Sequence, residues 1–357
     1  LSSERDKSLF MSTRCAFISA YLKGEEANLI TSDHMGRMSN ARTIQEVLEI
    51  IGDTDIGSYL EGTFIKTFDD ADEYLWRYFS GSIQHLESFR FLPSDISRIL
   101  RAYIVKYDVA NTKAALRGIS THKKGRMIPV GIIHTCGSLD ELFGAESLDD
   151  ICQTLAKCKL GDYANILKEQ EKRIDGGLKS RLLTESRLDS KYYESLLTMT
   201  EDVRDGFVLS KAFGLIIGLV NLQIICRAII GNIGPEAAEF PIPGGYMMPG
   251  EFVKELLSLK LGEIPGRLEG TQYQEVAEEV SNGYARTKSI TVVEEVIEKH
   301  RFRLVKEILS PRVLSPLVLA WWLILKEVEM RNLRLIIKAM ADNIPLEEIE
   351  DYLVLPS

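Results

Sequence analysis

One histidine and three cysteines are the residues whose types could bind a metal ion, and they are His134, Cys136, Cys152 and Cys158. A zinc site usually shows two pairs of ligands at short spacing, such as C-x₂₋₄-C. The first pair here is His-x-Cys, and the second is Cys-x₅-Cys on a predicted helix, where six positions place the two thiols on different faces. A zinc-dependent hydrolase is therefore kept only as an alternative.

Other patterns that could carry catalysis are incomplete. The five histidines are scattered along the chain, and no serine lies in a GxSxG setting. The run GGYMMPG (Gly244–Gly250) lacks the GxxxxGK[ST] phosphate loop and follows no predicted strand, so it is interpreted as a turn between helices. The sequence therefore predicts no catalytic residue, no bound metal and no cofactor.

Three predicted helices carry the same polar mark. Each has an asparagine inside an apolar stretch and a basic residue six positions later, and the pairs are Asn111 and Arg117, Asn221 and Arg227, and Asn332 and Lys338. The asparagines lie 110 and 111 residues apart, Gly137 and Gly245 lie 108 apart, and Tyr163 and Tyr273 lie 110 apart. A constant offset indicates one structural unit used three times.

A structural role explains these marks without a ligand. Asp108 lies three residues before Asn111 on the same helix face, and Glu329 and Asn332 repeat this pair, while Gly218 stands at the second copy's acidic position. A buried carboxamide without hydrogen bonds costs about 1–3 kcal/mol. We therefore predict that each pair ties its helix to a neighbouring helix end or to the loop that follows. The basic residue would complement the dipole at the helix C-terminus. The alternative is that the marks line a surface facing a partner.

The elements that must position these residues are helical almost throughout. Apolar residues recur at helical spacing from Ser94 to Gly118, and no stretch alternates as a sheet would. Many of the glycine and proline residues lie in two predicted loops, Gly118–Gly137 and Gly231–Gly250. We predict an all-α fold in which the chain begins and ends inside a repeat, with units at residues 1–120, 121–232 and 233–357.

Composition narrows the function classes. The 357 residues carry a net charge of −9 and are 45% hydrophobic, which argues against nucleic-acid binding as the main role. A basic run from His122 to Arg126 is interpreted as a solvated loop. No stretch reaches the ~18 consecutive apolar residues of a membrane span, so Phe213–Cys226 is predicted to be a buried core helix. Five cysteines without a CxxC pattern fit a reducing, cytoplasmic setting. The sequence begins at Leu1 rather than Met, which leaves the natural start open.

The motifs resemble those of a known family. KEVEMRNLR (Lys326–Arg334) is similar to the closing signature of the rotary-ATPase C-subunit family, which includes the archaeal and bacterial A/V-type C subunit and the d subunit of the eukaryotic V-ATPase. YDVANTKAALRG (Tyr107–Gly118) resembles the family's middle motif. TDI (Thr54–Ile56) is a weaker match, because the family often has tyrosine where Ile56 stands. The resemblance covers essentially the whole chain, and Gly218 departs from it.

This resemblance implies three similar helical domains around a pseudo-threefold axis, shaped like a funnel. It implies a non-catalytic, peripheral protein on the cytoplasmic face of the membrane. Its partners would be the D and F subunits of the central stalk and the membrane rotor ring of proteolipid c/K subunits, in an enzyme that couples proton or sodium transport to ATP synthesis or hydrolysis. Arg331 and Arg334 are expected to be interdomain ties or stalk contacts. A different helical-repeat scaffold, such as HEAT or TPR, is the alternative, although those repeats are about 34–47 residues long.

Overall fold

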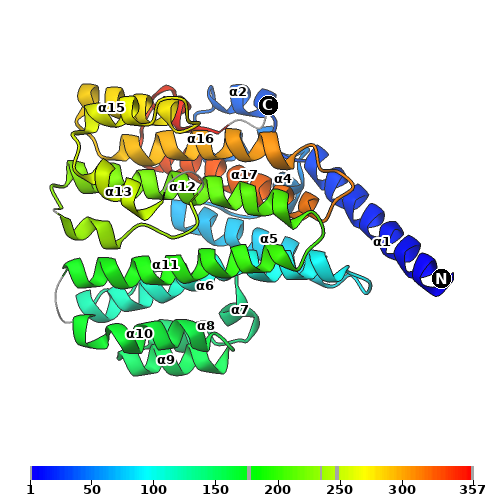
Figure 1. Ribbon diagram of the computed structural model, residues 1–357. Helices are drawn as coiled ribbons and strands as arrows, with labels where there is room; N and C mark the ends of the chain where they lie inside the picture. Colours follow the sequence, from blue (N-terminus) through cyan, green and yellow to red (C-terminus); the bar gives the residue numbers. More distant parts are fainter. Residues whose placement is uncertain (1, 175–177, 234, 246–248, 355–357) are drawn as a thin grey trace. The chain divides into compact units, whose positions relative to one another are not determined.

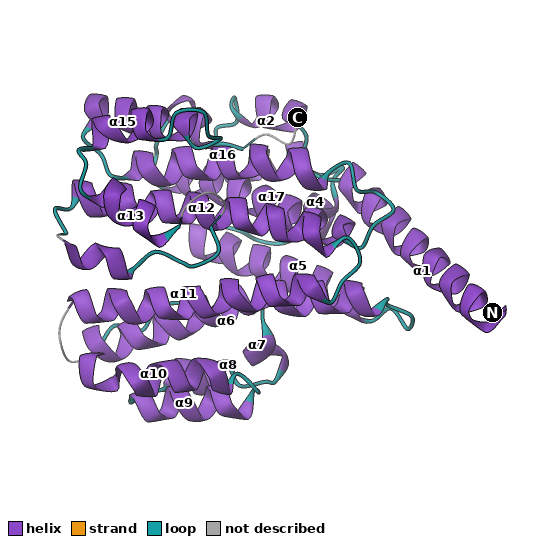
Figure 2. Cartoon of the chain, viewed as in Figure 1, coloured by secondary structure: helices purple, strands orange, loops and turns teal. Residues whose placement is uncertain are grey.

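The computed structural model of the chain describes residues 2–174, 178–233, 235–245 and 249–354. Helices joined by loops make up this part of the chain, and it contains no β-strand (Figure 2). The all-α prediction is confirmed. The expected helix Ser94–Gly118 is α6, which runs from Ser94 to Thr121.

The helices form two compact units. Unit 1 comprises residues 1–100 and 306–357, and unit 2 comprises residues 101–305. Unit 1 is thus built from both ends of the chain. The predicted division at residues 1–120, 121–232 and 233–357 differs from these two units and stays a prediction, as does the funnel of three domains.

Unit 1 is organised around α17 (Leu317–Ala341), which packs against α5 (Phe68–Glu87) and α1 (Ser2–Ala27) (Figure 1). Trp321 and Trp322 of α17 are buried in the core of this unit. The remaining elements of this unit are α2 (Ser32–Met38), α3 (Ile44–Ile50), α4 (Asp55–Leu60), η3 (Leu346–Glu348) and η4 (Glu350–Tyr352). The last two are short 3₁₀ helices.

Unit 2 contains most of α6 and of α16 (Thr291–Leu309). Within it, α10 packs against α9 and α11, and α11 packs against α12. Its other elements are α7 (Ile132–Thr135), α8 (Leu139–Gly144), α9 (Leu148–Lys157), α10 (Gly161–Ile174), α11 (Leu178–Glu201), α12 (Gly206–Ile230), η1 (Pro235–Glu239), α13 (Gly250–Leu257), η2 (Leu261–Glu263), α14 (Ile264–Arg267) and α15 (Gln274–Thr287).

Helix α12 is apolar around its whole circumference, as expected of a core helix. Its length and mean hydropathy of 2.1 make it the one candidate membrane span among the described residues. However, 61% of the 18-residue apolar segment of this helix that resembles a membrane span is buried inside the structure. Core helices of soluble proteins pass the same test, so the finding is weak evidence for a span.

Paired carboxylates lie at the starts of two helices, Asp69 and Asp70 on α5 and Asp149 and Asp150 on α9. Thr67 and Asp70 form a capping box at the start of α5, and Ser147 and Asp150 form another at the start of α9. The Thr67 hydroxyl and the nearby backbone amides lower the pKa of Asp70. These carboxylates therefore serve helix ends.

Candidate functional site

Each of the three repeated asparagines brackets one residue of the loop that follows its helix. The side-chain Nδ2 donates to that residue's carbonyl, and the side-chain Oδ1 accepts from its N–H, with lengths of 2.9 and 2.7 Å for Asn111 and Ile128, 2.8 and 2.7 Å for Asn221 and Ile242, and 2.7 and 3.1 Å for Asn332 and Val354. We call these three pairs the asparagine clamps.

The chemistry of the clamps explains the residue type. All three asparagines are buried. A carboxamide both donates and accepts, so it satisfies both backbone groups of one residue, whereas an ionised carboxylate only accepts. The clamped residue lies 17, 21 or 22 positions after its asparagine. The clamp thus fixes loops of different length to one point on each long helix.

Asp108 holds a second point of the first loop. Its carboxylate accepts hydrogen bonds from the amides of Ile132 (2.8 Å) and Ile133 (2.9 Å) at the start of α7. Gly131 precedes them with φ +112°, and a Cβ atom there would lie 2.4 Å from Asp108 Oδ1. Burial raises the pKa of Asp108 to about 7, and the two amide hydrogen bonds act in the opposite direction.

Glu329 occupies the matching position before Asn332 and also binds a backbone amide. Its Oε1 accepts from the N–H of Ile30 at 2.9 Å, and its Oε2 lies 3.8 Å from Lys326 Nζ. Lys326 is completely buried and donates to the Tyr78 hydroxyl at 2.6 Å. Burial raises the pKa of Glu329 to about 7, although the Lys326 ammonium favours ionisation. This acid therefore joins the two ends of the chain inside unit 1.

The second copy replaces the acid by close packing. A Cβ atom at Gly218 would lie 2.0 Å from the Tyr273 hydroxyl oxygen. Tyr273 is fully buried, so its ring fills the space beside α12 where the other copies place a carboxylate. The departure at Gly218 thus has a steric reason within the same copy.

The basic residues of the marks form ion pairs at half-exposed positions. Arg117 pairs with Glu185 of α11, and Arg227 Nη1 lies 2.8 Å from a carboxylate oxygen of Glu294 of α16. Lys338 pairs with Asp342, four positions later at the end of the same helix, at 3.0 Å. Surface pairs of this kind contribute little stability, about 0–1 kcal/mol.

Arg331 and Arg334 both have partners inside unit 1. Arg331 Nη1 donates to the Tyr352 carbonyl at 3.0 Å, next to the clamped segment. Arg334 forms an ion pair with Asp72 of α5 and lies 5.2 Å above the Trp76 ring. Since Asp72 is buried, Arg334 compensates a carboxylate that water does not reach. The Arg334–Asp72 ion pair links the two ends of the chain, whereas the Arg331 hydrogen bond lies within its C-terminal part.

The metal candidates do not gather in the described part of the chain, where no group of three or more histidine, cysteine or acidic residues has suitable spacing. Cys152 Sγ faces the Ala164 carbonyl at 3.6 Å. The Cys158 thiol lies against Ser138 and Cys136, and burial raises its pKa to about 11. Cys152 and Cys158 therefore face different surroundings.

Sequence reasoning missed the residues that the marks bind. The clamped positions are Ile128, Ile242 and Val354, three β-branched residues without a constant offset from their asparagines. Lys326 is the first residue of KEVEMRNLR and directly follows an apolar run, and this position was the available signal for a buried charge. Gly131 and Gly245 each lie three positions after the clamped residue of their loop. They are therefore the equivalent glycines of the two loops, rather than Gly137 and Gly245.

Comparison with known proteins assigns the chain to a group of relatives. The family model described as ATP synthase (C/AC39) subunit matches residues 18–352. The C subunit of the A-type ATP synthase of Methanocaldococcus jannaschii is 26% identical over 350 residues, which is 95% of this chain and 86% of the relative. The same subunits of Methanosphaera stadtmanae and Pyrococcus abyssi are 25% and 23% identical, over 90% and 95% of this chain and 85% and 90% of their own lengths.

Proposed function

The chain belongs to the ATP synthase (C/AC39) subunit family, and we propose that it is the non-catalytic protein that couples the central stalk to the rotor ring of an A-type or V-type rotary ATPase. Its partners in this proposal are the D and F subunits of the stalk and the membrane ring of proteolipid c/K subunits. It lies on the cytoplasmic face as a peripheral protein. The relatives are named as parts of the A-type ATP synthase, which favours the archaeal type of complex.

The observation that carries the proposal is the repeated asparagine clamp. A coupling protein must keep its shape under torque, and every clamp fixes a loop to a long buried helix through two hydrogen bonds. Asp108 and Glu329, two carboxyls whose pKa values are raised by burial, likewise bind backbone amides of their own unit. These polar groups support a mechanical frame.

A binding experiment with the purified chain tests the proposal. We would mix it with the matching D–F pair, and separately with the detergent-solubilised ring, at low and at high salt. Stoichiometric binding to both is expected, and its salt dependence measures the contribution of charged side chains. ATP hydrolysis by the chain alone would contradict the non-catalytic role. Failure to bind both the stalk pair and the ring would contradict the coupling role.

A further inference from the structure

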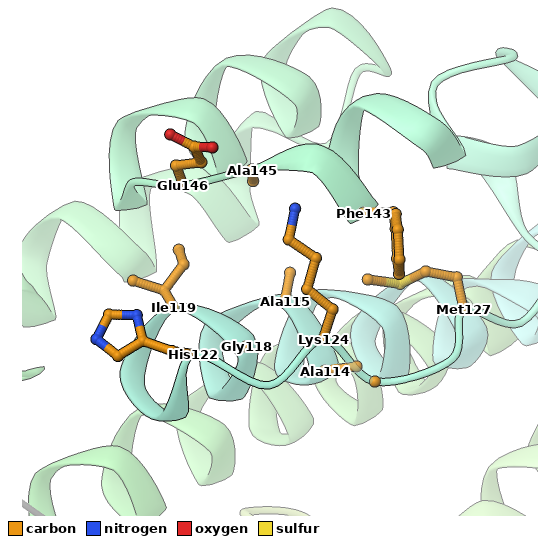
Figure 3. A pocket seen from close by; sticks show the side chains of 11 residues that line it. Ala114, Ala115, Gly118, Ile119, His122, Lys124, Met127, Phe143, Ala145 and Glu146 are labelled. Atoms are coloured by element: carbon orange, nitrogen blue, oxygen red, sulfur yellow. The ribbon is translucent and has the colours of Figure 1, made fainter.

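A cavity lies beside α6 in the first copy. The cavity has a volume of about 390 Å³ and lies beside the C-terminal part of α6, with α8 and the loop at residues 122–127 as its other walls (Figure 3). The lining is largely small or apolar, including Ala114, Gly118, Ile119, Met127 and Phe143. The first copy therefore leaves an apolar helix face uncovered.

The register of the asparagines identifies the same face in the second copy. Three and seven positions after Asn111 are Ala114 and Gly118, and the same steps after Asn221 lead to Ile224 and Ala228. Ala228 belongs to a buried hydrophobic cluster with Ala237 and Phe240, and Ile224 packs against this cluster. The face that lines a cavity on α6 is thus packed on α12.

The chain's own η1 provides that packing. This turn contacts both α12 and α13, and Ala237 at its centre is completely buried. The loop in the second copy has room for it, because Ile242 lies 21 positions after Asn221, whereas Ile128 lies only 17 positions after Asn111. The shorter loop of the first copy has no such turn.

The charges around the cavity complement the composition of η1. The segment reads PEAAEF (Pro235–Phe240), with small apolar residues between two glutamates. The loop at the cavity reads HKKGR (His122–Arg126), and Lys124 Nζ lies 5.3 Å from the centre of the exposed Phe143 ring. In Figure 3, Lys124 rises toward Ala145, while the carboxylate of Glu146, the acidic residue of the lining, points away.

We propose that this cavity is a docking site for a short helical turn of a partner polypeptide, in which small apolar residues lie between acidic side chains. The apolar residues pack on Ala114 and Gly118, as Ala237 packs on α12, and the acidic ones approach Lys124. The proposal goes beyond the coupling role, and its test uses neither the stalk nor the ring, so the two can fail separately.

A labelled peptide that copies residues 232–242 of this chain is the probe, titrated into the full chain by fluorescence anisotropy. Saturable 1:1 binding is expected. Ala114→Ile gives α6 the bulk that Ile224 gives α12, and it should weaken binding at least tenfold. Ala102→Ile, on the same helix outside the cavity, should leave the affinity unchanged. Circular dichroism establishes that both variants fold.

The second part of the experiment reverses the charges of the peptide and of Lys124. Replacing both glutamates of the peptide by lysine should weaken binding to the natural chain at least tenfold, and Lys124→Glu should reverse this preference. The proposal is overturned by the absence of saturable binding, by equal affinity for the Ala114→Ile variant, or by indifference to the peptide's charge.

Discussion

Replacing Asn221 by alanine tests directly how the repeated frame is held. The change removes two hydrogen bonds and leaves the N–H and C=O of buried Ile242 without partners. An unsatisfied buried polar group costs about 1–3 kcal/mol, so the pair predicts a loss of roughly 2–6 kcal/mol. Because a loop can shift and admit water, we expect the lower half of this range.

The assay must read the clamp locally as well as globally, since a chain with two compact units need not unfold in one step. Urea unfolding gives the change in the free energy of unfolding, and hydrogen exchange follows the Ile242 amide itself. The matched control is Gln223→Ala, at a half-buried position on the same helix, with an expected change within about 0.5 kcal/mol.

Asn221→Asp sharpens the test through pH. The carboxylate still accepts from the Ile242 N–H but repels the Ile242 carbonyl oxygen, which lies 2.8 Å from the present Nδ2. Burial and this repulsion raise the folded-state pKa of the new acid above its unfolded value, so stability is lost as pH rises. The free energy of unfolding of the variant should therefore be smaller at pH 8 than at pH 5. The reasoning is refuted if Asn221→Ala costs less than about 1 kcal/mol and Ile242 exchange stays slow.

Two further predictions concern charged groups. Since the folded-state pKa of Asp108, about 7, lies above its ordinary value, the unfolded state binds fewer protons, and the free energy of unfolding should fall as pH rises from about 4 to about 7. Asp108→Asn should remove this residue's share of the slope, and an unchanged slope would show that the carboxyl titrates normally. Arg334→Ala should cost about 1–3 kcal/mol because it removes an ion-pair partner of the buried Asp72 on α5. Lys338→Ala, at an exposed pair, should stay within about 0.5 kcal/mol; urea midpoints of equal size for the two variants would contradict this account.

The sequence predicted those features that depend on local chemistry. The helix from Ser94 to Gly118, for example, was predicted from the spacing of its apolar residues, and it is α6. The asparagines were recognisable because burial of a carboxamide inside an apolar helix demands a specific partner. Repetition at a fixed offset then identified the copies without any knowledge of the partner.

The partners themselves depend on contacts far apart in the chain. Glu329 and Ile30 are separated by 299 positions, and no local pattern connects them. The loop residues Ile128 and Ile242 are reached across loops of unequal length, so a periodic search misses them. The burial of Lys326 was not predicted, because the hydroxyl that accepts its hydrogen bond belongs to Tyr78, which lies 248 positions away.

The three copies differ at the position three residues before the asparagine, which is Asp108, Gly218 or Glu329, although all three keep the clamp. A carboxamide satisfies both backbone groups of a clamped residue at any pH, whereas an aspartate of similar size does so only when it is protonated. The acid merely accepts hydrogen bonds and fills space, so another helix can take over the second task. Tyr273 does this against Gly218. Restoring an acid at Gly218 would therefore collide with Tyr273, and the second copy can regain a carboxylate only if its tyrosine becomes smaller as well.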